Sequence, residues 1–149
     1  MIKIALAVLA LSSMAVSRVG HSNAATPDGI PKVVALLKSD DLQVRREALR
    51  ELADLGAKAK SAEIHLLDFL VRTYREERKK EYPCLHCEAS IAVRALGSMG
   101  SVSPATEGAL LSFLRVAPQD TEFDQELIYA LGKVGTRHEK IVPATGDSA

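Results

Sequence analysis

The sequence lacks a net charge, and beyond its first residues it lacks a long apolar run. Nineteen Lys and Arg residues balance nineteen Asp and Glu residues in the 149-residue chain. Proteins that bind nucleic acid usually show a basic patch and a high pI, so this balance gives no reason to expect a nucleic-acid partner. A membrane-spanning helix needs about 20 consecutive apolar residues, and no segment of the sequence reaches that length.

The sequence also lacks the common motifs of catalysis. It contains no Gly-rich phosphate loop, no nucleophile-elbow pattern and no ordered Ser-His-Asp triad. No stretch alternates polar and apolar residues for long enough to predict a β-strand. We therefore expect an all-α protein that is not an enzyme and that uses no cofactor.

The first 25 residues have the layout of a secretory signal peptide. Lys3 gives a small positive head, residues 4–16 form an apolar run, and Ala24 or Ala25 offers a small residue for cleavage. Removing residues 1–25 leaves 124 residues, which is the size of one domain. We expect the mature chain to be exported to the periplasm or the cell exterior, with no stable membrane insertion after cleavage; an uncleaved anchor is the alternative.

The remaining chain repeats itself. Three segments align without gaps and end at Gly56, Gly100 and Gly135, which lie 44 and 35 residues apart. We call them the A segments. Between them lie the B segments: residues 61–70 match residues 105–114 at the same offset of 44, and residues 29–37 form a third copy. Self-similarity at such a period is typical of repeat proteins, in which one unit is a pair of secondary-structure elements.

Both kinds of segment have helical periodicity. The first A segment places Val44, Ala48, Leu52 and Leu55 on one face. Asp40 or Asp41 provides the N-cap, and Gly56 can take the left-handed conformation that ends a helix. In the first full B segment we expect the apolar stripe to contain Ile64, Leu67, Leu70, Val71 and Tyr74, with His65 beside it as a partly buried structural side chain. A helix with one apolar stripe must pack on its neighbours, so the pattern predicts an α-solenoid of about two and a half antiparallel helix pairs.

The stretch IPKVVALLKSDDLQVRREALRELADLG resembles a short bacterial HEAT repeat of the kind found in the phycobilisome-lyase family. The resemblance rests on Leu36-Leu37, Asp40-Asp41, Val44-Arg45 and Leu55-Gly56, and it extends over residues 29–144, leaving residues 145–149 as a disordered tail. It implies a curved stack whose concave side, lined by the B helices, holds a partner protein. The candidate binding residues on that side are Glu63, Asp68, Arg72, Arg75, Arg78 and Lys79.

Two segments of the sequence depart from the repeat. About nine extra residues follow Leu70, in the segment VRTYREERKKEYP. They fit a solvated extension of the B helix, or a protruding basic knob for an acidic partner or a membrane surface. The third unit is incomplete, so the stripe of Leu127, Leu131 and Val134 is expected to have an uncovered side. Self-association or docking through this end would cover it, and a truncated gene product is the alternative explanation.

The two cysteines, Cys84 and Cys87, form a Cys-x-x-Cys pair with His86 inside it. The internal alignment places the pair at the start of the second A helix. Haem attachment requires a histidine where Glu88 stands, and a zinc site requires four ligands at suitable spacing. A local disulfide between Cys84 and Cys87 suits an exported protein. A thiol-disulfide or metal-dependent activity centred on the pair is the alternative function to protein binding.

Overall fold

The computed structural model describes residues 29–77, 79, 88–116, 122–136 and 141, and these residues are mainly helical. No β-strand occurs among these residues, and the all-α prediction is confirmed. The elements are α1 (Ile30–Leu36), α2 (Leu42–Leu55), the 3-10 helix η2 (Gly56–Ala62), α3 (Glu63–Glu77), α4 (Glu88–Ser98), α5 (Pro104–Val116) and α6 (Glu122–Lys133).

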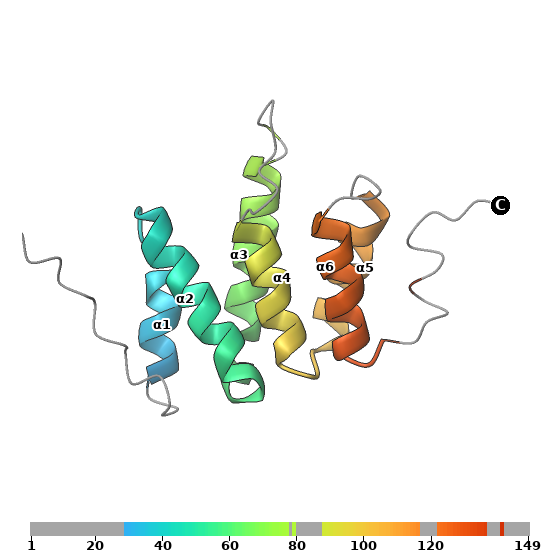
Figure 1. The fold of residues 1–149 in the computed structure, drawn as a ribbon, viewed down its shortest axis with the longest axis horizontal. Coiled ribbons are helices and arrows are strands. Elements are labelled where there is room, and N and C mark those ends of the chain that lie inside the picture. Colours follow the sequence, from blue (N-terminus) through green and yellow to red (C-terminus); the bar gives the residue numbers. More distant parts are fainter. Residues whose placement is uncertain (1–28, 78, 80–87, 117–121, 137–140, 142–149) are drawn as a thin grey trace, which may run out of the picture.

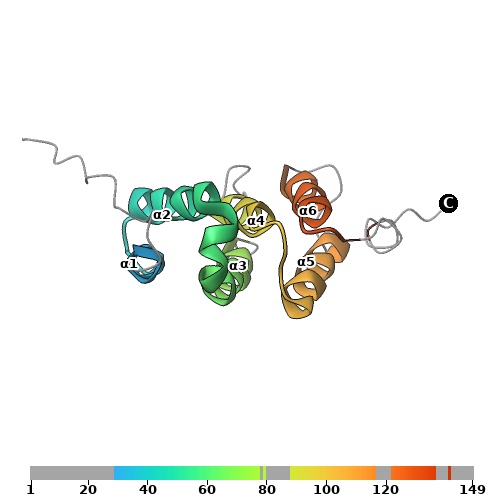
Figure 2. The same ribbon diagram turned by 90° about the horizontal axis from the view of Figure 1, so that it is seen from below.

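The helices form two layers. Figure 2 shows α2, α4 and α6 side by side in one layer, with α1, α3 and α5 in the other. Helix α4 is central: it packs against α2 and α6 within its own layer and against α3 in the second layer (Figure 1). Helices that follow one another along the chain therefore alternate between the layers, in the order in which the A and B segments alternate in the sequence.

The helix ends follow the predicted pattern. Gly56, Gly100 and Gly135 all have positive φ, at 52°, 71° and 80°. This is the region that residues with a Cβ rarely adopt, which explains why all three A segments end in glycine. At the other end of α2, the cap is Asp41: its Oδ1 accepts hydrogen bonds from the backbone N–H groups of Gln43 at 2.7 Å and Val44 at 3.4 Å.

Aligned apolar residues form the core between the layers. Leu52, Leu96 and Leu131 occupy one repeat position, and all three are fully buried. The next position behaves differently, because Leu49 and Val93 are fully buried whereas Ile128 is 39% exposed. The predicted open stripe of the third unit was therefore misplaced. Leu127 and Leu131 are fully buried and Val134 is half-buried, whereas Ile128 and Tyr129 are the large apolar side chains of α6 that are exposed.

The predicted stripe of the B helix was also wrong in part. Leu70 and Tyr74 are buried as expected, but Ile64 is 66% exposed and His65 is exposed rather than partly buried. The buried face of α3 is completed by Leu66 and Phe69. Helix α3 carries two apolar stripes at helical spacing, and only its packing against α4 and α5 selects one of them.

Three aromatic rings join α3, α5 and α6. The ring centroid of Tyr74 lies 4.9 Å from that of Phe113 in an edge-to-face contact and 5.1 Å from that of Phe123 in a stacked contact. Phe113 and Phe123 lie 6.4 Å apart. Offset and edge-to-face ring pairs add about 0.5–1.5 kcal/mol each to the burial of their surface. The cluster therefore fastens the second B helix to the last helix pair.

Candidate functional site: a groove between α4 and α6

We call the contact between two packed helices a joint. The joint between α2 and α4 contains a bidentate ion pair. Arg45 donates from Nε to Glu88 Oε1 at 2.7 Å and from Nη2 to Oε2 at 3.0 Å, and its Nη1 donates to the carbonyl groups of Ser39 and Asp40. The two side chains are 22% and 9% exposed. The hydrogen bonds to Glu88 raise the pKa of Arg45, although burial opposes this. Because the guanidinium group is satisfied on three sides, it holds the start of α2 against the start of α4.

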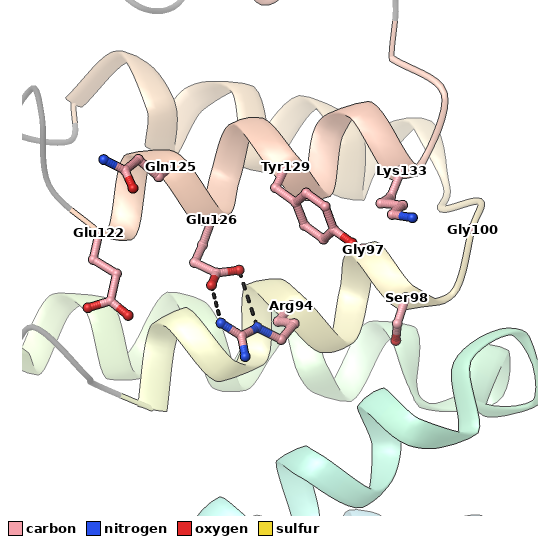
Figure 3. A pocket seen from close by; sticks show the side chains of 9 residues that line it. All are labelled: Arg94, Gly97, Ser98, Gly100, Glu122, Gln125, Glu126, Tyr129 and Lys133. Atoms are coloured by element: carbon pink, nitrogen blue, oxygen red, sulfur yellow. Dashed lines mark hydrogen bonds and ion pairs between the residues drawn. The ribbon is translucent and has the colours of Figure 1, made fainter.

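The joint between α4 and α6 uses the same chemistry at the surface. Arg94 donates to both carboxylate oxygens of Glu126, from Nη2 to Oε1 and from Nε to Oε2 at 3.4 Å (Figure 3). The hydrogen bond to Glu126 is the main reason why the pKa of Arg94 is raised. Here the arginine side chain is 59% exposed, so one edge of the pair faces solvent.

A third joint connects α3 with α5. Glu63 is buried, and its Oε1 accepts hydrogen bonds from the Ser103 backbone N–H at 2.6 Å and from the Thr106 hydroxyl at 2.7 Å. Lys60 Nζ lies 3.3 Å from the other carboxylate oxygen. Burial alone would raise the pKa of Glu63, but the hydrogen bonds from Thr106, Ser103 and Lys60 outweigh burial and lower the pKa to about 2. Its carboxylate is thus used inside the molecule, and we leave Glu63 out of the proposed binding residues.

A groove of about 720 Å³ opens between α4 and α6. The two helices approach closely at Gly97, where an added Cβ would lie 2.8 Å from Ala130 Cα. Glycine is required at such a contact because any side chain would push the helices apart. The groove runs past this contact and the Arg94–Glu126 pair, as Figure 3 shows. Its lining residues are Arg94, Gly97, Ser98, Gly100, Glu122, Gln125, Glu126, Tyr129 and Lys133.

Tyr129 is the most exposed aromatic residue in the groove, at 56%. Lys133 Nζ lies 5.3 Å from the centre of its ring, within the range of a cation–π contact. A second groove, between α2 and α4, shares Arg94 and Glu122 with the first and is otherwise lined mainly by α2 residues, including Arg46 and Arg50. The outer surface of the α2, α4 and α6 layer therefore offers adjoining hollows in which an aromatic ring lies among charged groups of both signs.

The predicted binding residues lie elsewhere, on α3. Asp68, Arg72 and Arg75 are exposed there, and Arg72 lies 5.8 Å from the ring centre of Phe69. Lys79 is exposed and pairs with Glu76 at 2.8 Å. Arg78 lies outside the described residues. The structure thus places the described members of this set along α3 and, for Lys79, just beyond its end, and not in the α4–α6 groove.

Cys84, His86 and Cys87 lie outside the described residues, so the disulfide and its redox or metal alternatives stay predictions. Within the part of the chain that the structure describes, no three His, Cys, Asp or Glu side chains are grouped so that they could hold a metal ion. None of the helices formed by the described residues has the length and apolar character needed to cross a membrane.

Comparisons with known proteins found no match among models of protein families, curated proteins or solved structures. No family membership is shown for this chain.

The groove residues were missed in the sequence, although a signal for one of them was present. Tyr129 occupies the repeat position at which the two earlier A segments carry Arg50 and Arg94. An aromatic residue in place of an exposed arginine makes the surface at this repeat position less charged and more apolar. The ion pair between Arg94 and Glu126 gave no such signal, because 32 residues separate the partners in the chain.

Proposed function

We propose that the chain is an exported α-solenoid of HEAT-like helix pairs that binds another protein and catalyses no reaction. The two alternating layers and the common glycine ends support a stack of repeats rather than a closed bundle. Such stacks present long surfaces on which partners dock. The layer formed by α2, α4 and α6 provides one such surface here.

The observation that carries the proposal is the exposure of Tyr129 in the α4–α6 groove. Tyrosine and arginine are enriched at protein interfaces because each combines a large apolar area with a polar end. Tyr129 lies beside Arg94 and Lys133, so a partner side chain that enters the groove would meet an aromatic face and charged groups together. We propose this groove as the main contact, with the exposed α3 residues Asp68, Arg72 and Arg75 as a second one.

Site-specific photo-crosslinking tests this proposal. The full chain would carry benzoylphenylalanine at position 129, at position 64 on α3, or at the exposed control position 58 on η2. After illumination in cells of the source organism, we expect one discrete adduct from position 129 and none from position 58. The partner would be identified by mass spectrometry and its affinity measured with the purified proteins.

With the purified partner, Tyr129→Ala should weaken binding by about 2 kcal/mol, the usual cost of removing a tyrosine anchor. An adduct from position 64 alone would move the contact to α3. No adduct at either position, or equal affinity of wild type and Tyr129→Ala, would remove the groove as a binding site.

Export is the second part of the proposal and has its own test. The support is the apolar run at residues 4–16 and the small residues at positions 24 and 25. Amino-terminal sequencing of the chain recovered from the native cells should begin at Ala25 or Thr26. A chain that retains Met1 would contradict cleavage.

A further inference from the structure

Arg94 borders two grooves at once. Its Nε and Nη2 donate to Glu126 on the side of α6, and its third guanidinium nitrogen, Nη1, points away from Glu126 (Figure 3). The same residue lines the second groove, of about 380 Å³, between α2 and α4. Because a guanidinium group carries five N–H donors in one plane, the nitrogen that Glu126 does not engage can bind a second acceptor.

Arg50 contributes a second guanidinium group to the α2–α4 groove. It has the same repeat position on α2 as Arg94 has on α4, and the axes of packed helices lie about 8–10 Å apart. Arg50 is exposed and forms no ion pair with another residue in the described part of the chain. Arg46 lies one turn earlier on the same side of α2 and also lines the groove. Two long side chains from adjacent helices can therefore reach one acceptor between them.

The α2–α4 groove holds more arginines than carboxylates. Asp54 lies one turn after Arg50, and Glu122 lies in the first turn of α6. Within the described residues no ion pair joins Asp54 to Arg50, so the charge of Arg50 has no direct counter-ion there. The remaining lining residues are Ala53, Ser90 and Ile91. Since the chain as a whole has equal numbers of basic and acidic residues, the preference for an anionic group is local to this groove.

A carboxylate fits this arrangement best. Arginine side chains bind carboxylates through two parallel hydrogen bonds, and such charge-assisted bonds are roughly twice as strong as neutral ones. Arg50, Arg94 and Tyr129 share one repeat position on α2, α4 and α6, so a segment that crosses the layer would meet them in that order. Two helix spacings amount to about 16–20 Å, which about six extended residues can span.

We propose that the partner enters the α2–α4 groove with an aspartate or glutamate, whose carboxylate binds between Arg50 and Arg94, an inference that rests on the proposed function because this groove adjoins the one that contains Tyr129. The partner is thus a protein with an acidic residue in the extended segment that contacts Tyr129.

NMR spectroscopy of the ¹⁵N-labelled full chain tests the groove without the partner, with hexaglutamate as the probe and hexaglutamine as the uncharged control. We expect hexaglutamate to shift the Nε–Hε resonances of Arg50 and Arg94 saturably and hexaglutamine to leave them in place. Added salt should weaken the binding, because the contact is charged and open to solvent. The absence of a saturable shift at both arginines would overturn the proposal.

Two variants of the groove should change this binding in opposite directions. Arg50→Gln should raise the dissociation constant of hexaglutamate about tenfold, because it removes charge-assisted hydrogen bonds. Asp54→Asn should lower it about threefold, because it removes a like charge from the groove. Arg115→Gln is the matched control, since Arg115 is an exposed arginine on α5, and it should leave the constant unchanged. Equal losses in Arg50→Gln and Arg115→Gln would contradict a specific site.

The partner captured by crosslinking at position 129 provides the second test. Neutralising its acidic residues one at a time should find one whose loss is not additive with Arg50→Gln, which identifies the carboxylate in the groove. Additive losses for every acidic residue would overturn the proposal. A specific adduct from position 129 without any effect of Arg50→Gln would leave the proposed function standing and remove the acidic contact, so the two ideas fail separately.

Discussion

An arginine–glutamate ion pair connects α4 with a neighbouring helix on each side, and the two pairs differ in how far water can reach them. Toward α2, the Arg45–Glu88 pair is largely buried and the arginine is also satisfied by two carbonyl groups. Toward α6, the Arg94–Glu126 pair borders a groove, and its arginine side chain is 59% exposed whereas that of the glutamate is 14% exposed. Removing one partner of a mostly buried ion pair leaves an uncompensated charge and costs more free energy than removing one partner of a pair that water can reach. The Arg45–Glu88 pair therefore mainly holds α2 against α4, whereas the Arg94–Glu126 pair leaves the arginine accessible to a binding partner.

The α4–α6 joint should depend more on close packing than on charge. Gly97→Val would force a side chain into the space occupied by Ala130 and should lower the free energy of unfolding by about 3 kcal/mol. Urea denaturation of the full chain measures this loss. Gly108→Val is the control, because valine there has open space and changes only helix propensity. Equal losses in both variants would show that the joint is not tightly packed at Gly97.

The hydrogen-bonded carboxylate of Glu63 should make the free energy of unfolding depend on pH. The carboxyl pKa is about 2 in the folded chain, whereas the ordinary pKa of a glutamate is 4.5, so the unfolded state binds the proton more tightly. The contribution of Glu63 is complete above pH 4.5 and is lost as the pH falls toward 2. As the pH falls through this window, we expect the free energy of unfolding of the wild type to fall by about 2 kcal/mol more than that of Glu63→Gln. An unchanged slope between wild type and variant would contradict the lowered pKa.

The two ion pairs can be compared directly. Glu88→Gln should lower the free energy of unfolding by about 1.5 kcal/mol, since Arg45 keeps a charge in a mostly buried place without its counter-ion. Glu126→Gln should cost about 0.5 kcal/mol or less, because water replaces the carboxylate beside Arg94. High salt should weaken only the second effect further. Chemical denaturation at low and high ionic strength measures both, and a larger loss in Glu126→Gln would reverse the comparison.

Another small effect concerns the cysteines that precede Glu88. A disulfide between Cys84 and Cys87 closes a very short loop, so reducing it should lower the free energy of unfolding by only about 1 kcal/mol. Thiol titration with mass spectrometry on freshly isolated protein should find no free thiol. Two free thiols would rule out the disulfide. The same titration in Glu88→Gln shows whether the adjoining α2–α4 joint influences the pair.

Local features were the ones that could be predicted from the sequence. The Asp41 cap and the positive φ of Gly56 were predicted and act within one turn of the chain, and Gly100 and Gly135, predicted as the ends of the other two A segments, share that positive φ. The core leucines Leu52, Leu96 and Leu131 were visible because the repeat places them at the same position. The solenoid as a whole stays a proposal.

Features that depend on contacts between helices could not be predicted in this way. Ile64 belongs to an apolar stripe as regular as the buried one, yet it faces solvent. Glu63 cannot be told from a surface glutamate in the sequence, because its partners Ser103 and Thr106 are about 40 residues away in the chain. The groove beside Tyr129 is lined by residues of both α4 and α6, which approach closely at Gly97 although they are distant in the sequence. Sequence alone thus determined where helices end and which residues repeat, because backbone conformation and helical period are local. Tertiary structure decided which faces are buried and which charges are paired, because desolvation depends on neighbours that are distant in the chain.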